Sequence, residues 1–192
     1  ADGKQCIGAI ALSDVLRPEA KDMVSQLWRM HTKTVLLTGD NKKAADYFAR
    51  QIGISQVQAE LLPEEKVQNI HNLQQEGCTV CMIGDGVNDA PALKTADVSV
   101  AMGSMGSDIA VDAADIALMQ DDISKIPYLK RLSNATVATI KCSITLSMCI
   151  NFAAIILSLQ EVLNPTTGAL VHNAGSCFVV LIAALLYDRK FV

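Results

Sequence analysis

The sequence lacks two features that are typical of secreted proteins. Its first residues, ADGKQ, have neither the basic start nor the apolar core of a signal peptide. Its six cysteines do not form the compact framework of a small disulfide-rich domain, and half of them lie in the apolar C-terminal third. We therefore expect a reducing compartment, and we interpret the first residue as a cut in a longer chain.

Formal charge is missing from two long stretches near the C-terminus, residues 142–159 and 168–187. About 20 apolar residues span the hydrocarbon core of a bilayer. The pattern favours two transmembrane helices over residues 141–160 and 168–187, joined by an extracytoplasmic loop over residues 161–167. The alternative is a pair of buried helices in a large soluble domain.

Composition divides the chain into two parts. Hydrophobic residues make up 51% of the sequence, which is high for a purely soluble protein. Residues 133–192 carry three basic and two acidic side chains, so the net charge of −4 is concentrated in the first 132 residues, which carry −5.

Basic residues flank the apolar stretches and are missing from the loop between them. By the positive-inside rule, the connector over residues 123–140 and the tail over residues 188–192 both lie in the cytoplasm. The basic residues concerned are Lys125, Lys130, Arg131 and Lys141 before the first stretch and Arg189 and Lys190 after the second.

The first 122 residues alternate between short apolar runs and segments of helical spacing. This alternation predicts an α/β fold, a Rossmann-like parallel sheet with helices on both faces, whose functional residues gather at the carboxyl ends of the strands. The expected strands are residues 6–12, 34–40, 57–62, 78–85, 97–103 and 114–119, all on one sheet. The expected helices are residues 17–30, 42–52 closed by Gly53, and one that begins near Pro63.

Cys78 and Cys81 form a C-x-x-C pair inside a predicted strand. Positions three apart in a strand face opposite sides of the sheet, and the sequence has no second pair. We interpret both as ordinary core cysteines.

Two carboxylates, Asp85 and Asp89, lie four residues apart just after a predicted strand. Mg²⁺ prefers hard oxygen ligands and binds through one or two carboxylates together with phosphate. Gly84 and Gly86 let the backbone approach a ligand closely, and Asn88 is positioned to orient Asp85 or a phosphate oxygen. The alternative is a glycine-rich turn with two solvated aspartates.

A second strand ends in Thr38, Gly39 and Asp40, which offer a hydroxyl and backbone N–H groups to phosphate oxygens. Lys66, on the helix after Pro63, supplies the positive charge that holds a phosphate during transfer. Taken alone, Lys66 also fits an ordinary solvated lysine. Together these residues predict phosphoryl-transfer chemistry.

Four motifs occur in the order in which P-type ATPases carry them: TGDN, LPEEK, GDGVNDAPAL and MG-x-x-G-x-D-x-A-x-x-x-A-D. The chain resembles the C-terminal portion of that family, most closely its heavy-metal-transporting members. The resemblance implies part of a haloacid-dehalogenase-like phosphorylation domain over residues 1–122, followed by the last two membrane helices.

The resemblance also implies Mg²⁺ and ATP as cofactors and a role for each motif residue. Thr38 and Gly39 bind phosphate, Asp40 lines the site, Lys66 stabilises it, Asn88 contacts the phosphate, and Asp85 with Asp89 holds Mg²⁺.

One departure from the family pattern is that no Asp-Lys-Thr-Gly-Thr segment, which carries the family's nucleophile, occurs in these residues. Asp14 is followed by Val-Leu-Arg and does not fit that role. We expect the chain alone to be inactive and to work with a missing N-terminal part of the same pump.

Polar residues inside membrane helices mark functional sites by default. The candidates for binding the transported ion are Asn151, His172, Asn173 and Ser176. Imidazole suits divalent transition metals better than it suits Cu⁺, and the segment HNAGS resembles the last helix of some zinc, cadmium and cobalt pumps. The alternative for His172 and Asn173 is a position at the membrane boundary, where they meet water.

The sequence thus predicts a fragment of an ATP-driven pump for Zn²⁺, Cd²⁺ or Co²⁺ in a multi-pass membrane protein, with the cell membrane as its expected location. The alternatives are a copper pump, a soluble phosphatase of the dehalogenase type, and a non-catalytic module. No nucleic-acid partner is expected.

Overall fold

The computed structural model describes residues 15–84, 87–102, 112–120, 122–161 and 163–185. The chain divides into two compact units, residues 1–124 and 125–192. The strand expected over residues 6–12, the residues Asp85 and Gly86, most of the MG-x-x-G run and the tail over residues 188–192 lie outside the described residues.

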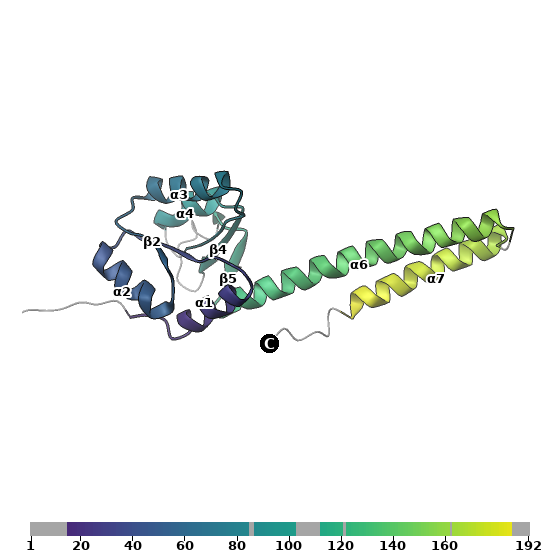
Figure 1. Cartoon of the computed structure of the whole chain (residues 1–192), viewed down its shortest axis with the longest axis horizontal. Helices are drawn as coiled ribbons and strands as arrows, with labels where there is room; N and C mark the ends of the chain where they lie inside the picture. Colours follow the sequence, from purple (N-terminus) through teal and green to yellow (C-terminus); the bar gives the residue numbers. More distant parts are fainter. Residues whose placement is uncertain (1–14, 85–86, 103–111, 121, 162, 186–192) are drawn as a thin grey trace, which may run out of the picture. The chain divides into compact units, whose positions relative to one another are not determined.

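The first unit alternates strands and helices, as the sequence predicted. Figure 1 shows α3 and α4 on one side of the strands and α1 and α2 on the other. The described elements are α1 (Ala20–Arg29), β1 (Val35–Leu37), α2 (Lys42–Ile52), β2 (Gln56–Gln58), α3 (Pro63–Gln75), β3 (Cys81–Gly84), the 3-10 helix η1 (Val87–Asp89), α4 (Ala90–Thr95), β4 (Val98–Met102) and β5 (Ile116–Leu118).

Local signals determine where α2 begins and ends. The Asn41 side chain caps its first turn by accepting a hydrogen bond from the backbone N–H of Ala44 at 2.9 Å. Gly53 ends the helix with a φ of 84°, a left-handed conformation that glycine adopts without strain. The predicted helix over residues 42–52 is confirmed.

The start of α3 follows the same logic. Pro63 occupies the first turn, where its missing N–H costs nothing, and Glu65 accepts a hydrogen bond from the backbone N–H of Leu62 at 2.7 Å. This cap fixes the turn that precedes Lys66.

The described strands pair in parallel but form two sheets, β1-β2 and β3-β4-β5. The prediction of parallel strands is confirmed, whereas the expectation that all of them share one sheet is not met by the described residues. Two strands belong to one sheet only when they pair directly or through strands between them. The described part of the chain contains no strand that connects β1 to β3.

A shared core nevertheless joins the two sheets. Ile70 of α3, Met82 of β3 and Leu93 of α4 are buried together, and Leu37 of β1 packs against this cluster. The carboxyl ends of β1 and β3 are therefore held in one unit, which positions the loops that follow them.

The interpretation of Cys78 and Cys81 as core residues is wrong, because both side chains are exposed. The strand β3 begins only at Cys81, so Cys78 lies in the connection after α3. A short apolar run does not show where strand pairing begins.

The second unit is a pair of long apolar helices, α6 (Lys125–Leu159) and α7 (Pro165–Ala184). Both are long and apolar enough to cross a membrane, and none of their most apolar windows is buried within the protein. The alternative of buried helices in a soluble domain therefore has no support in the described residues. A single helix, α6, covers both the expected connector and the first expected membrane segment.

Candidate functional site

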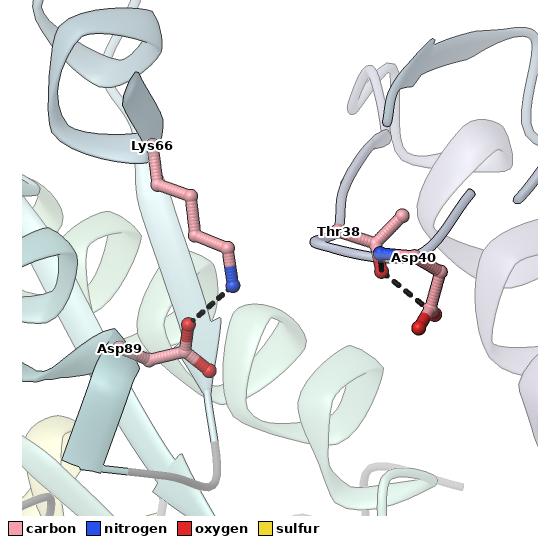
Figure 2. Close-up of polar contacts among 4 residues, drawn as sticks. All are labelled: Thr38, Asp40, Lys66 and Asp89. Atoms are coloured by element: carbon pink, nitrogen blue, oxygen red, sulfur yellow. Dashed lines mark hydrogen bonds and ion pairs between the residues drawn. The ribbon is translucent and has the colours of Figure 1, made fainter. Parts of the chain in front are cut away.

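Lys66 and Asp89 form an ion pair between two of the sequence motifs. The ammonium Nζ of Lys66 lies 2.7 Å from Oδ1 of Asp89, and the two side chains are only 14% and 15% exposed (Figure 2). Lys66 comes from α3 and Asp89 from the end of η1, twenty-three residues further along the chain. Partial burial reduces screening by water, so the pair holds these two elements in register.

Gly84, the last residue of β3, leaves the space that the Asp89 side chain occupies. A Cβ atom at Gly84 would lie 2.8 Å from the Cβ of Asp89 and 3.1 Å from its Oδ2. Glycine is therefore favoured here by the close approach of the Asp89 side chain, whereas the sequence predicted glycine for the approach of a ligand, which stays a prediction. The carboxylate of Asp89 is held directly over the carboxyl end of β3.

The loop after β1 is organised by Thr38. Its hydroxyl donates a hydrogen bond to Oδ2 of Asp40 at 2.8 Å and accepts one from the backbone N–H of Asp40 at 3.1 Å (Figure 2). This is a compact turn of the kind in which a side-chain oxygen replaces a backbone partner. Gly39 sits between the two, with room for a Cβ only at ordinary contact distance from the carbonyl of Leu61.

The chain after β2 clamps this loop, which sequence reasoning did not foresee. The backbone N–H of Glu60 donates to the carbonyl of Asp40 at 2.9 Å, and that of Leu61 donates to the carbonyl of Thr38 at 3.1 Å. Glu60 has a φ of 60°, an uncommon value for a residue with a side chain. The sequence indicated only that the strands are parallel, which brings the ends of β1 and β2 to the same edge of the sheet.

Two further carboxylates tie the strands together. Ser99, a buried residue of β4, donates hydrogen bonds to Oδ2 of Asp115 from its hydroxyl at 2.8 Å and from its backbone N–H at 2.9 Å. These bonds hold the pKa of Asp115 below its ordinary value. The pKa of Asp97 is lowered likewise, chiefly by a 2.7 Å hydrogen bond from the backbone N–H of Val80.

The structure brings some predicted site residues together and leaves others apart. Lys66 and Asp89 are in contact, and Thr38 and Asp40 form a separate pair in the same unit (Figure 2). Asn88 lies in η1 next to Asp89, and its side chain is exposed.

The donor chemistry of this site fits Mg²⁺. Asp89 supplies a hard carboxylate at a strand end, and Mg²⁺ is usually held by one or two carboxylates, waters and phosphate oxygens. No group of three or more His, Cys, Asp or Glu side chains that could hold a metal occurs among the described residues. Water and phosphate oxygens are the further ligands that Mg²⁺ commonly takes at such a carboxylate.

The polar residues of the two long apolar helices α6 and α7 also make hydrogen bonds. His172 Nδ1 and Asn151 Oδ1 are 2.9 Å apart, so α7 and α6 share a hydrogen bond. The hydroxyl of Ser176 donates to the carbonyl of His172 at 3.0 Å, within its own helix. Asn173 is exposed and neighbours His172 in the chain.

The first unit thus combines parallel strands and helices with polar loops at the strand ends and a partly buried lysine–aspartate pair. A family model described as "haloacid dehalogenase-like hydrolase" matches residues 1–97. The chain belongs to the haloacid dehalogenase-like hydrolases.

Similar proteins extend this assignment over the hairpin. The chain is 40% identical to a cadmium-transporting ATPase of Staphylococcus aureus over 97% of this chain and 26% of that protein. It is 40% identical to a zinc-transporting ATPase of Bacillus subtilis (strain 168) over 92% of this chain and 28% of that protein. A crystal structure of a zinc-transporting PIB-type ATPase in the E2.Pi state matches with a TM-score of 0.85 and 35% identity, over 90% of this chain and 28% of that one.

The chain therefore corresponds to the C-terminal region of a heavy-metal P-type ATPase, as its motifs predicted. It spans about a quarter of the length of the curated relatives that it matches.

Proposed function

We propose that this chain supplies the Mg²⁺ and phosphate contacts, and the final membrane hairpin, of an ATP-driven pump for a divalent transition metal such as Zn²⁺, Cd²⁺ or Co²⁺. The soluble unit faces the cytoplasm and the hairpin lies in the cell membrane. The single observation that carries the proposal is the Lys66–Asp89 pair at 2.7 Å, since it joins the LPEEK and GDGVND motifs at one strand end.

Lys66 and Asp89 bring opposite charges to this site. The Lys66 ammonium offsets negative charge on the transferred phosphoryl group, and electrostatic stabilisation of this kind, together with positioning, accounts for most of the catalysis of phosphoryl transfer. Asp89, together with Asp85, would hold Mg²⁺, which would supply positive charge to neutralise the phosphate. Because Lys66 already pairs with Asp89, both charges are in place before substrate arrives.

The loop after β1 holds the phosphate from the other strand. Thr38 presents a hydroxyl and Gly39 a backbone N–H group, while the backbone N–H of Thr38 donates to the carbonyl of Gln58 at 3.0 Å. Asn88 contacts a phosphate oxygen from η1. The bonds from Glu60 and Leu61 fix the loop, so little ordering is required on binding. The phosphoryl group passes from ATP to an aspartate outside this chain, releasing ADP, and water later cleaves the aspartyl phosphate.

A substitution at Lys66 tests the proposal in the full-length pump. Lys66→Ala removes the cation and leaves Asp89 unpaired, so the phosphoenzyme formed from ATP is expected to fall by about 100-fold or more. Lys94→Ala is the matched control, because Lys94 is an exposed lysine of the neighbouring helix α4.

The measurement is acid-stable phosphoenzyme with labelled ATP, Mg²⁺ and Zn²⁺, at equal protein amounts. A normal level of phosphoenzyme in Lys66→Ala would contradict the assignment of this site. A loss that also appears in Lys94→Ala would show that charge removal in general, and not this pair, is responsible.

A further inference from the structure

The hydrogen bond between His172 and Asn151 lies at matching depth in the two membrane helices. Asn151 precedes the end of α6 at Leu159 by about 12 Å, and His172 follows the start of α7 at Pro165 by about 10 Å, at 1.5 Å per residue. The pair is therefore two turns inside the hairpin from its connecting loop, deeper than the sequence indicated for His172.

The hydrogen bond to Asn151 determines which ring nitrogen of a neutral His172 carries the proton. The Asn151 carboxamide oxygen can only accept a hydrogen bond, so Nδ1 of His172 must donate the proton across the 2.9 Å separation. In a neutral imidazole the other nitrogen, Nε2, then keeps its lone pair. Nε2 is the atom that remains able to bind a metal.

The two helices approach each other closely next to the pair. A Cβ atom at Gly175 would lie 2.9 Å from the Cγ2 of Ile150, so α7 approaches α6 through a residue without a side chain. Gly175 is three residues from His172, and Ile150 is adjacent to Asn151. The contact between Gly175 and the Ile150 side chain and the hydrogen bond between His172 and Asn151 thus hold α6 and α7 in the same relative position.

Ser176 does not compete for the imidazole nitrogens. Its hydroxyl proton is donated to the carbonyl of His172, one turn back along α7. Of the polar side chains at this level, Asn151 is the one whose bond determines the orientation of the His172 ring.

We infer that Asn151 is a positioning residue that holds His172 with Nε2 free to bind the transported cation. This inference rests on the proposed function, and it separates Asn151, a partner of the ligand, from His172, the ligand itself. Metal-binding histidines commonly donate their second N–H to an oxygen acceptor, which fixes the tautomer and the ring orientation. A single imidazole nitrogen favours borderline divalent ions such as Zn²⁺ over hard Mg²⁺.

The test compares four variants of the full-length pump: His172→Ala, Asn151→Leu, Asn151→Asp and Thr145→Val. Asn151→Asp keeps an oxygen acceptor at the same distance along the side chain, whereas Asn151→Leu removes it. Thr145→Val is the control, since the Thr145 hydroxyl bonds to the carbonyl of Lys141 in its own helix α6. Zn²⁺ bound at equilibrium, the KM for Zn²⁺, kcat and the visible spectrum with Co²⁺ are measured.

His172→Ala is expected to lose Zn²⁺ binding, and Asn151→Leu to weaken it by about 10- to 100-fold through KM with a smaller change in kcat. Asn151→Asp is expected to restore the affinity and the Co²⁺ spectrum, and Thr145→Val to match the unmodified pump.

Normal binding in His172→Ala would overturn the cargo site itself. Loss in His172→Ala with normal binding in Asn151→Leu would overturn only the positioning role. Equal loss in both Asn151 variants would also overturn that role, because the amide itself would then be required.

Discussion

Two contacts position the Asp89 side chain. The Lys66 ammonium lies 2.7 Å from its carboxylate, and the side chain packs against Gly84, where a Cβ atom would collide with it. Both constraints act on one carboxylate, so its position does not depend on a flexible side chain finding a partner. The motif GDGVND identified Gly84 and Asp89 as candidate site residues, but it did not indicate the contact with Lys66, which lies twenty-three positions away in the chain. Only the packing of α3 beside η1 produces it.

Gly84→Ala tests the close approach at this site. The added methyl group would collide with the Cβ of Asp89, so we expect a loss of about 1–3 kcal/mol in the free energy of unfolding, together with reduced phosphoenzyme. Gly168→Ala is the control, because a Cβ at Gly168 meets no atom within 4 Å. Thermal unfolding and phosphoenzyme assays of the full-length pump measure both effects. Unchanged values in Gly84→Ala would mean that Asp89 moves away without consequence.

At the scale of elements, the helices were more predictable than the strands. The caps at Asn41 and Gly53 are local, because each satisfies backbone groups within one helical turn. Strand pairing joins distant segments, so the sequence indicated parallel strands without showing that, among the described residues, β1 and β3 do not share a sheet. The exposed Cys78 and Cys81 were misinterpreted for the same reason, since burial of a short apolar run depends on what covers it.

The link between β4 and the start of β5 predicts a specific dependence of stability on pH. Ser99 lowers the pKa of Asp115, so ionised Asp115 stabilises the folded state above the ordinary aspartate pKa of about 4. This stabilisation is lost as the pH falls through the lower folded pKa. Asp115→Asn should therefore lower the melting temperature at neutral pH, and its difference from the unmodified protein should shrink below about pH 4.

Melting temperatures measured from about pH 3 to about pH 8 test this trend, because proton binding and stability are linked. Asp112→Asn is the control, since Asp112 is an exposed aspartate in the same region, whereas the Ser99 hydroxyl donates to Asp115. A pH-independent difference for Asp115→Asn would contradict the role of its ionised form.

At the scale of the whole molecule, one chain contains two units that differ in how much apolar surface they expose. The boundary at residue 124 separates an α/β unit with its own core from two helices whose apolar windows are unburied within the protein. By length and composition, these helices are candidate membrane spans. The Lys66–Asp89 pair lies in the first unit and the His172–Asn151 pair in the second, so the proposed transport would need both units.

Cysteine labelling tests the orientation of the hairpin. In a full-length pump with its native cysteines replaced, Glu161→Cys in the connecting turn should react with an impermeant reagent from outside intact cells. Glu76→Cys at the end of α3 should react only after the membrane is opened, since the basic flanks predict that both ends of the hairpin face the cytoplasm. Labelling of Glu76→Cys in intact cells would reverse the proposed orientation.

The sequence by itself determined the α/β class, the two ends of α2, the start of α3 and the two long apolar helices, because these depend on local periodicity, capping and chemical type. The tertiary structure alone decided the Lys66–Asp89 pair, the clamp from Glu60 and the bond between Asn151 and His172. Each of these contacts joins segments that are distant in the chain. Their formation depends on how helices and strands pack, which no local pattern specifies.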